Sequence, residues 1–292
     1  MALRATGWAG LVSAALVVPS VAADLKLAPA AGATAEDTFK FETRAFLTSD
    51  YIYRGVSLSQ HKPSGGAYGE AEWRGLYVGT NVQSVDLPTQ PAAEITWSAG
   101  YRWSMAGFDL DLGANYFWYP GEMLADGQPA TSYVEYALNV DRDVTEQVSL
   151  TGQLAYSPNV SGTGAWGSYA EAGAEISLPA FMTDVEWQLN GGVGYWRFGN
   201  TSPMQGGFPL PAYTNWHVGL QFILKKHFTL DLVYSDTNLS KEDCFVFTGD
   251  TMATPGGIAN PVSNPDGLRS RLCGATLFAT LTVKLDQSDF KR

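Results

Sequence analysis

The chain alternates apolar and polar residues in twelve separate segments, and in nearly all of them the charged side chains share one parity. The clearest run, 108–116, places Asp109 and Asp111 between apolar neighbours. Successive side chains of a β-strand point to opposite faces, so each segment would have one apolar and one polar face. The pattern predicts strands at 39–54, 66–74, 76–85, 93–103, 108–119, 131–141, 147–157, 168–178, 185–197, 213–224, 228–237 and 274–285.

The connections between these segments alternate in length. Short ones at 74–75, 104–107, 142–146, 179–184 and 225–227 are interleaved with longer ones at 55–65, 86–92, 120–130, 158–167, 198–212 and 238–273. Most segments have the roughly 9–11 residues that a tilted strand needs to cross a bilayer. Short periplasmic turns and long extracellular loops are typical of outer-membrane barrels. We therefore expect an all-β fold, a closed antiparallel transmembrane β-barrel of about 12 strands, with 238–273 as its longest extracellular loop.

The apolar face predicts contact with lipid, because aliphatic residues occupy its middle and aromatic residues its ends. One expected belt, at the outer rim, contains Tyr51, Tyr53, Trp118, Tyr156, Tyr195, Trp216 and Tyr234. The other, at the inner rim, contains Trp73, Trp103, Phe108, Trp187 and Phe228. Two such belts mark the two membrane–water interfaces. The alternative is a soluble sandwich or barrel with its core on this face.

The opposite parity carries too many ionisable groups for a dry core. The predicted pore-lining residues are Glu42, Arg44, Asp50, Arg54, Glu70, Glu72, Glu94, Arg102, Asp109, Asp111, Glu135, Glu171, Glu175, Glu186, His217 and Asp231, and Lys40, Arg74 and Lys284 share their parity. Twelve carboxylates and six Lys and Arg make this face acidic, which favours cations and neutral polar solutes in a wet lumen. The alternative is a plug of Arg–carboxylate pairs, and a barrel of this size permits both.

Aromatic residues also occupy the inward parity. They are Tyr68, Tyr77, Phe117, Tyr119, Tyr133, Tyr169 and Trp196. Two roles are open to them: a sliding surface for sugar-like solutes, or simple filling of the lumen.

The first 38 residues are expected to direct export. Residues 1–23 have the features of a cleaved signal peptide, with Arg4, an apolar core at 10–18 and small residues at 21–23. The apolar core is too short to be a membrane helix. The Ala- and Pro-rich stretch 24–38 is predicted to be a flexible periplasmic tail, and 39–292 the barrel.

The charge balance limits the partners. A net charge of −11 argues against nucleic acid, whose phosphates require basic patches. The expected location is the outer membrane of a Gram-negative bacterium, and the expected partners are its lipid and small hydrophilic solutes. The sequence leaves open whether the barrel is a monomer or a homo-oligomer.

Few residues carry candidate chemistry. Cys244 and Cys273, the only two cysteines, bracket the longest loop and are expected to form a disulfide in the oxidising periplasm. His61, His217 and His227 do not cluster, and no nucleophile motif accompanies them. We therefore expect no catalytic residue, metal or cofactor. A barrel lipid hydrolase that uses His217 is the less favoured alternative.

The stretch Ser49-Asp50-Tyr51-Ile52-Tyr53-Arg54-Gly55-Val56-Ser57, followed by Gly75-Leu76-Tyr77-Val78-Gly79-Thr80-Asn81-Val82, resembles the opening of the TorF-family porins. These are exported barrel proteins of Gram-negative bacteria, and the resemblance is strongest over residues 39–110. It implies an outer-membrane, porin-like role and supplies no substrate or catalytic residue. Asp50 and Arg54 match the S-D-Y-x-x-R-G core. They either shape the pore mouth as a pair or tie the first long loop to the wall.

The end of the chain departs from the usual barrel pattern, in which the last strand closes on an aromatic residue. Here the sequence runs past Leu285 to Phe290 and two basic residues. Either the last strand extends to Phe290, or assembly uses a weaker signal.

Together these features predict an outer-membrane channel for passive diffusion of small hydrophilic solutes, with a mild cation preference and no enzymatic step. The main alternative is a non-conducting barrel that acts through its extracellular loops as a receptor, an adhesin or a structural protein. The sequence does not identify the solute, and it leaves open whether 238–273 folds into the pore.

Overall fold

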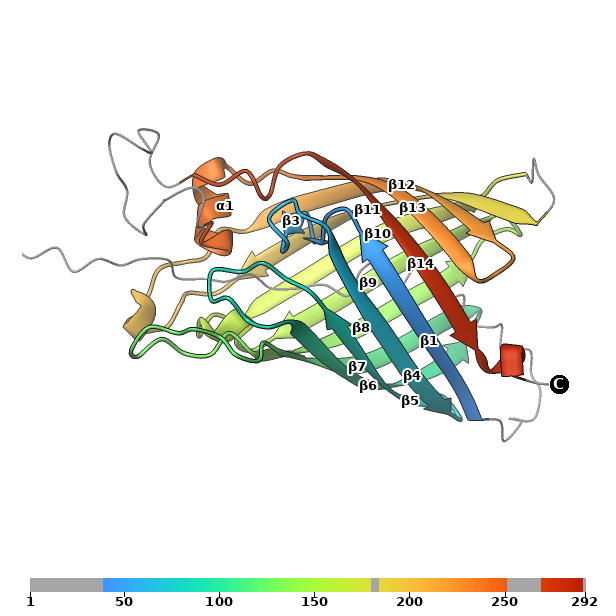
Figure 1. Ribbon diagram of the computed structural model, residues 1–292, viewed down its shortest axis with the longest axis horizontal. Coiled ribbons are helices and arrows are strands. Elements are labelled where there is room, and N and C mark those ends of the chain that lie inside the picture. Colours follow the sequence, from blue (N-terminus) through green and yellow to red (C-terminus); the bar gives the residue numbers. More distant parts are fainter. Residues whose placement is uncertain (1–38, 180–183, 251–268, 291–292) are drawn as a thin grey trace, which may run out of the picture.

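The computed structural model describes residues 39–179, 184–250 and 269–290, and its strands close into one antiparallel barrel (Figure 1). The predicted signal peptide (1–23) and tail (24–38) lie outside the described residues. The barrel closes where β1 (Phe39–Thr48) pairs with β14 (Thr276–Asp286). The other barrel strands are β4 (Ser64–Trp73), β5 (Leu76–Gln83), β6 (Glu94–Met105), β7 (Phe108–Trp118), β8 (Tyr133–Asp143), β9 (Val148–Ser157), β10 (Gly167–Ser177), β11 (Val185–Phe198), β12 (Tyr213–Leu224) and β13 (Phe228–Thr237). The predicted fold class, a closed barrel of twelve antiparallel strands, is confirmed.

One end of the barrel carries the short turns that the sequence predicts. Arg74-Gly75, Ala106-Gly107 and Lys225-Lys226 each have positive φ at both positions, as in the two-residue turns whose twist matches paired strands. A side chain at position 75 is excluded, because its Cβ would lie 2.4 Å from the carbonyl oxygen of Arg102. The start of β1 and the end of β14 lie at this same end (Figure 1). We call it the turn end, and the opposite end, with the long connections, the loop end.

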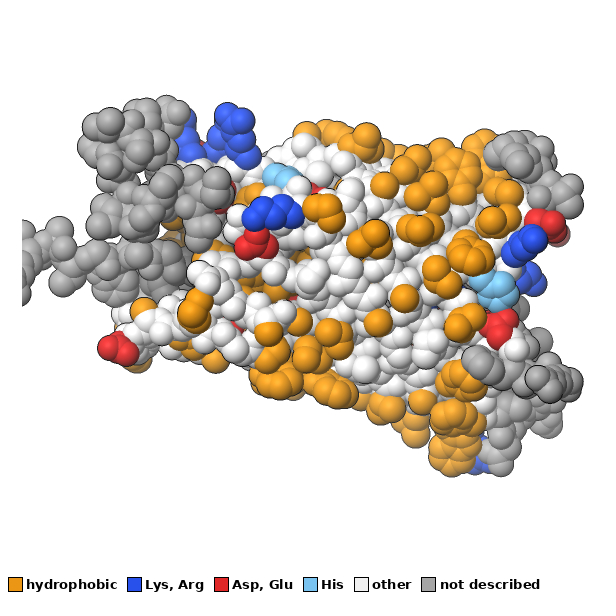
Figure 2. Space-filling model, viewed as in Figure 1, with side chains coloured by type: hydrophobic (Ala, Val, Ile, Leu, Met, Phe, Trp, Pro, Cys, Tyr) orange, Lys and Arg blue, Asp and Glu red, His pale blue; other side chains and the backbone are white. Residues whose placement is uncertain are grey.

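On the face shown in Figure 2, apolar side chains are spread over the barrel wall between its two ends, and charged side chains lie near the ends. The outward aliphatic residues that remain about half exposed include Leu150, Leu154, Val193, Val218 and Leu281. Exposed aromatic residues follow the two rims, with Trp118, Tyr156 and Tyr195 at the loop end and Trp73 and Phe228 at the turn end. No helix in the described part of the chain is long and apolar enough to cross a membrane.

The first predicted strand is too long, and the prediction that Tyr51 and Tyr53 belong to the outer aromatic belt is wrong. β1 ends at Thr48, whose hydroxyl donates to the backbone oxygen of Asp50 at 2.7 Å. The chain then turns inward and forms a small hairpin of β2 (Ile52–Tyr53) and β3 (Val56–Ser57), which pair with each other and not with the barrel. Tyr51 and Tyr53 are only 2% and 5% exposed as a result. We call residues 50–59 the inner hairpin.

The described part of the longest loop folds over the loop end of the barrel. It contains α1 (Lys241–Thr248), which begins at Ser240, whose side chain accepts a hydrogen bond from the Asp243 amide. Cys244 and Cys273 form the predicted disulfide, with a Cα–Cα distance of 5.7 Å. Residues 251–268 lie outside the described part.

The last strand does not extend to Phe290. β14 ends at Asp286, and Gln287–Phe290 form a 3-10 turn. Of the two alternatives left open by the sequence, a longer final strand is therefore excluded.

The exposed aliphatic band predicts a depth-dependent cost for charge. Leu154→Arg, on the outward face of β9, is expected to lower the free energy of unfolding in lipid by about 2–4 kcal/mol. Leu76→Arg, equally exposed but beside a turn, is expected to cost about 0–1 kcal/mol. Urea unfolding in phospholipid vesicles measures both. Equal costs at the two positions would contradict a lipid-facing band.

Candidate functional site

A cavity of about 310 Å³ occupies the lumen on the turn-end side of the inner hairpin. Every barrel strand except β1 contributes to its lining. Glycines in the wall make room for tyrosines that lie against it. A Cβ at Gly113 would be 2.4 Å from the Tyr77 hydroxyl, and a Cβ at Gly194 would be 2.1 Å from the Tyr169 hydroxyl.

The tip of the inner hairpin lies in the lumen beside β13, and the Arg54 side chain reaches from it to β8 and β9 on the opposite wall. Its turn, Arg54-Gly55, has positive φ at both residues, and a Cβ at Gly55 would lie 2.2 Å from Cγ2 of Thr237 on β13. Only glycine fits this position, because it needs both the left-handed conformation and the close approach. The R-G of the S-D-Y-x-x-R-G motif is therefore the tip of a hairpin inside the barrel.

The tip is held by a buried ion pair. The Nη1 and Nη2 atoms of Arg54 donate to the two carboxylate oxygens of Glu135, each at 2.9 Å, and both side chains are 6% exposed. Nη2 also donates to Oε1 of Gln153 at 3.3 Å. Burial by itself would lower the pKa of Arg54, but the Glu135 carboxylate outweighs it and raises this pKa. The Arg54 guanidinium is thus charged, and its contacts with Glu135 and Gln153 fix its position.

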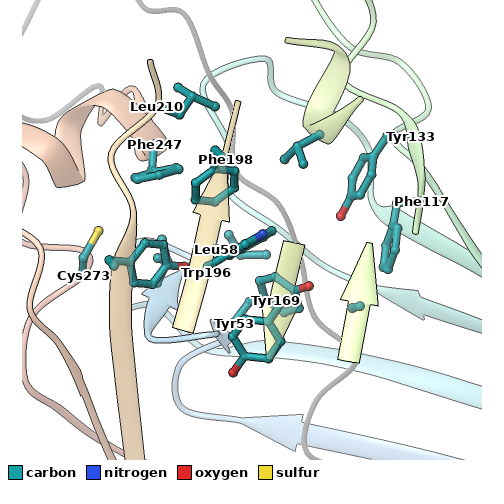
Figure 3. Close-up of a cluster of buried hydrophobic side chains, with 14 of the residues drawn as sticks. Tyr53, Leu58, Phe117, Tyr133, Tyr169, Trp196, Phe198, Leu210, Phe247 and Cys273 are labelled. Atoms are coloured by element: carbon teal, nitrogen blue, oxygen red, sulfur yellow. The ribbon is translucent and has the colours of Figure 1, made fainter. Parts of the chain in front are cut away.

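Three aromatic rings surround the same guanidinium. Its central carbon lies 3.9 Å from the ring centroid of Tyr169, 4.4 Å from that of Trp196 and 4.6 Å from that of Tyr53. Figure 3 shows these rings within a larger buried cluster that includes Leu58, Phe198 and Phe247. The predicted inward aromatics Phe117, Tyr119, Tyr133, Tyr169 and Trp196 are at most 4% exposed, so they fill the loop-end half of the lumen.

Asp50 organises the base of the inner hairpin. Its carboxylate accepts hydrogen bonds from the hydroxyls of Ser57 at 2.6 Å and Ser59 at 2.9 Å, and it lies 2.6 Å from Nδ1 of His61. Asp50 and Arg54 do not pair with each other in these contacts. Of the two roles considered for the motif, the geometry matches the second, a tie between the first long connection and the wall.

Arg102 is the centre of an ion-pair network near the turn end. Its guanidinium contacts Glu70 at 2.5 Å and 2.8 Å, Glu72 at 3.1 Å and Asp111 at 3.1 Å. It also lies 4.0 Å from the centroid of the Tyr77 ring. The network continues across neighbouring strands through Lys40–Glu72, Arg44–Glu42 and Lys284–Glu42 pairs.

The facing wall, on β8 to β12, is acidic. Asp141, Glu171 and Glu175 line the cavity there. Among the described residues, Asp141 and Glu171 make no ion pair, and Glu171 accepts a hydrogen bond from the Tyr169 hydroxyl. His217 lines the cavity nearby and faces Ser235 across the β12–β13 pair. In the described part of the structure no hydrogen bond joins His217 to Ser235 or Glu171.

The predicted pore-lining residues divide into several groups. Those that line the 310 Å³ cavity are Arg54, Glu70, Arg102, Asp111, Glu135, Glu171, Glu175 and His217. Those that line a second cavity of about 40 Å³ are Arg44, Asp50 and Asp231. Glu42 and Glu72 belong to the ion-pair network, and Glu186 is exposed near the turn end. Asp109 accepts a hydrogen bond from Ser104 at the same end.

Glu94 has a different surrounding from the other predicted lumen residues. It is 0% exposed and accepts hydrogen bonds from the hydroxyls of Tyr51 at 2.7 Å and Tyr119 at 2.9 Å. Arg74, of the same parity group, is exposed in its turn over the ring of Trp73.

Whether the cavity-lining residues act in conduction stays a prediction.

Two features of the site were missed. Asp141 has the parity of Glu135, so the alternation could have included it in the lumen. The inner hairpin could not be recognised from the alternation, because the pattern of β1 continues through Tyr53 and predicts one uninterrupted strand. Among the described residues, no group of His, Cys, Asp and Glu is arranged to hold a metal ion.

These features define a twelve-stranded β-barrel with an apolar exterior, a charged lumen and a hairpin folded inside it. The sequence matches the family described as "Bacterial protein of unknown function (Gcw_chp)" over residues 32–255, and the chain belongs to this family. No curated protein matches the sequence.

Several solved barrels are similar at a distance. The NanC porin has a TM-score of 0.45 at 9% identity, covering 83% of this chain and 98% of that one. The KdgM porin has a TM-score of 0.44 at 10% identity, covering 84% and 97%. An outer membrane channel from Pseudomonas putida F1 has a TM-score of 0.39 at 10% identity, covering 88% and 98%. These likenesses are too distant to assign a function or a solute.

The Arg102 network predicts an uneven response to loss of its cations. Arg102→Met leaves three carboxylates together in the lumen, so the free energy of unfolding should fall by about 3–5 kcal/mol. Lys40→Met removes a cation from the same Glu72 but at an exposed position, and should cost about 0–1 kcal/mol. Urea unfolding in detergent compares the two variants. A cost for Arg102→Met no larger than that for Lys40→Met would contradict the network.

The His61–Asp50 contact predicts a pH-dependent anchor for the inner hairpin. The hydrogen bond to Asp50 raises the pKa of His61, although partial burial opposes the shift. A raised pKa means that the stabilisation is complete below the unfolded pKa, about 6.5, and is lost as pH rises through the higher folded pKa. His61→Gln should therefore lower Tm more at pH about 5 than at pH about 9. In an Asp50→Asn background this pH dependence should become much smaller, because only the weaker effects of the Arg271 backbone oxygen and Asp250 still raise the His61 pKa. An unchanged pH dependence there would contradict the anchor.

Proposed function

We propose that the protein is an outer-membrane, porin-like channel through which small hydrophilic solutes diffuse passively. The observation that carries the proposal is a closed barrel with an apolar exterior and a charged cavity of about 310 Å³ inside. An exterior of half-exposed aliphatic residues between aromatic rims suits a bilayer. Ionisable groups in such numbers require water or one another. Passage through the lumen needs no cofactor and no chemical step.

The charges of the cavity support a mild preference for cations. Six carboxylates line it, against two guanidinium groups. Arg102 balances only one of the two carboxylates beside it in the cavity, Glu70 and Asp111, and on the facing wall Asp141 and Glu171 make no ion pair among the described residues. A lumen with an acidic wall raises the local concentration of cations.

The size of the lumen favours small solutes. The inner hairpin and the aromatic cluster fill the loop-end half, and the remaining cavity is at the lower limit of the roughly 300–1,000 Å³ of small-molecule sites. The resemblance of residues 49–57 to the TorF-family porins agrees with an export-dependent location in the outer membrane of a Gram-negative bacterium.

A second candidate is a non-conducting barrel that acts through its loops. One observation favours it: the inner hairpin lies in the lumen, and Arg54 ties it to the far wall. In this case the barrel would hold the long connections, including α1, as a surface for a partner.

Planar-bilayer recording separates the two candidates and tests the charge assignment. The channel should give discrete conductance steps. The triple variant Asp141→Asn, Glu171→Gln, Glu175→Gln should lower the cation-to-anion permeability ratio severalfold, because it removes the charge of the acidic wall. A matched triple variant at exposed positions, Asp126→Asn, Glu146→Gln, Asp184→Asn, should have little effect.

Two outcomes would count against the proposal. Unchanged reversal potentials in the lumen variant would refute the role of the acidic wall. Absence of steps for the wild type would favour the non-conducting barrel.

A further inference from the structure

The wall residues around Arg54 form a compact site that faces the lumen. Glu135 on β8, Gln153 on β9, Tyr169 on β10 and Trp196 on β11 come from four adjacent strands. Their side chains converge on one guanidinium, which arrives from the other side of the barrel. The four residues together are called the wall site.

The chemistry of the wall site is specific for a planar cation. Glu135 offers two oxygens in the fork that a guanidinium matches, and the contacts are 2.9 Å each. Tyr169 and Trp196 present ring faces within 4.4 Å of the cationic carbon. Gln153 contributes a carbonyl oxygen at 3.3 Å. A carboxylate fork between aromatic faces selects guanidinium over a neutral group of the same shape.

The barrel wall, rather than the hairpin, holds the site in shape. Tyr169 lies over Gly194, where a Cβ would be 2.1 Å from its hydroxyl, and this hydroxyl lies 3.2 Å from Oδ1 of Asn215. The barrel hydrogen-bond ladder is complete without β2 and β3. The backbone of the wall site and the position of the Tyr169 ring therefore do not depend on Arg54.

The inner hairpin is attached to the rest of the chain mainly at its base. The Ser57 amide donates to the Leu272 oxygen at 2.7 Å, and the Asp86 amide donates to the Leu58 oxygen at 2.9 Å. At the tip, the contacts with the wall are those of the Arg54 side chain, the edge-on packing of the Tyr53 ring on Trp196 at 5.6 Å and the packing of Gly55 on Thr237. Release of the tip would thus leave the barrel sheet intact.

We propose that the wall site is a binding site for guanidinium-bearing solutes and that Arg54 is a tethered occupant which such a solute displaces. The inference rests on the proposed function, because the solute reaches the wall site through the lumen. Solute binding and docking of the hairpin tip are mutually exclusive, so the solute shifts the hairpin toward its released position.

The tether sets the concentration at which this exchange occurs. A group on a short tether has an effective concentration in the millimolar range, so a free solute competes poorly with Arg54 in the wild type. Removal of the Arg54 guanidinium removes the competitor and leaves the wall site vacant. The variant should bind guanidinium-bearing molecules more tightly than the wild type.

Isothermal titration calorimetry with methylguanidinium, on the full chain in nanodiscs, tests this order of affinities. Arg54→Met should bind one methylguanidinium per barrel at least about tenfold more tightly than the wild type. Adding Glu135→Gln should weaken binding at least about tenfold, since the charged acceptor is lost. Adding Glu175→Gln instead, which removes the same charge elsewhere in the cavity, should change it by no more than about twofold.

Urea, a neutral molecule of similar planar shape, is the matched control ligand and should not bind measurably at the same concentrations. Binding of urea and methylguanidinium with equal affinity would overturn the inference. So would an Arg54→Met/Glu135→Gln variant that binds as well as Arg54→Met.

A second measurement keeps Arg54 in place and does not depend on the folding of a variant. Hydrogen exchange at the amides of Gly55 and Val56, at the hairpin tip, should accelerate severalfold in the wild type with methylguanidinium and not with equimolar urea. Equal exchange in both would contradict displacement of the tip.

Planar-bilayer recordings of the same proteins distinguish failure of this inference from failure of the proposed function. Conductance steps without methylguanidinium binding would refute the wall site and leave the channel. Binding without steps would establish the wall site in a barrel that does not conduct.

Discussion

Closure of the sheet confines the ionisable groups of twelve strands to one narrow lumen, and this constraint determines much of the interior. In a closed barrel each strand side chain points either outward or into the lumen, so every side chain of the inward parity must lie in the lumen. The molecule meets this constraint in two ways. Near the turn end, Arg102 gathers three carboxylates into a network. Near the loop end, a hairpin brings Arg54 across the lumen to Glu135.

The Arg54–Glu135 pair illustrates what a buried ion pair contributes. Desolvation of two charges offsets most of their attraction, so such a pair is weak evidence for stability. Its geometry is demanding, however, since two oxygens, an amide and three rings must all meet one guanidinium. The pair therefore specifies where the hairpin docks. The hydrophobic contacts of Leu58 and its neighbours then fill the remaining space.

The strands and their order could be predicted because the two faces of a closed sheet alternate strictly, apolar outside and polar inside. For β12 and β13 the predicted bounds and the observed ones coincide, and most other strands differ by a few residues. The inner hairpin could not be predicted from this pattern. Residues 50–54 continue the alternation of β1, although Thr48 and Asp50 have already turned the chain away from the wall. The alternation shows that one face of a segment is apolar and the other polar. It does not show whether the apolar face lies on the outside of the barrel or packs inside it.

The candidate site was predictable in part for the same reason. Parity placed Glu135, Arg102 and Glu171 in the lumen, but the pairing of Arg54 with Glu135 joins residues 81 positions apart. Such a contact depends on barrel diameter and on the reach of a connection, which local sequence does not encode. The disulfide was predictable because only two cysteines occur. The packing of Phe247 from the same loop against Phe198 and Tyr213 was not.

The central claim is that residues 50–59 lie inside the barrel, and thiol labelling of Val56→Cys tests it most directly. Val56 is 3% exposed, and both native cysteines are in the disulfide, so a new thiol is labelled without background. In the purified, folded protein a maleimide should react with Val56→Cys far more slowly than with Met204→Cys, whose parent side chain is 79% exposed. Equal labelling rates at the two positions would place this segment outside the barrel and contradict the account.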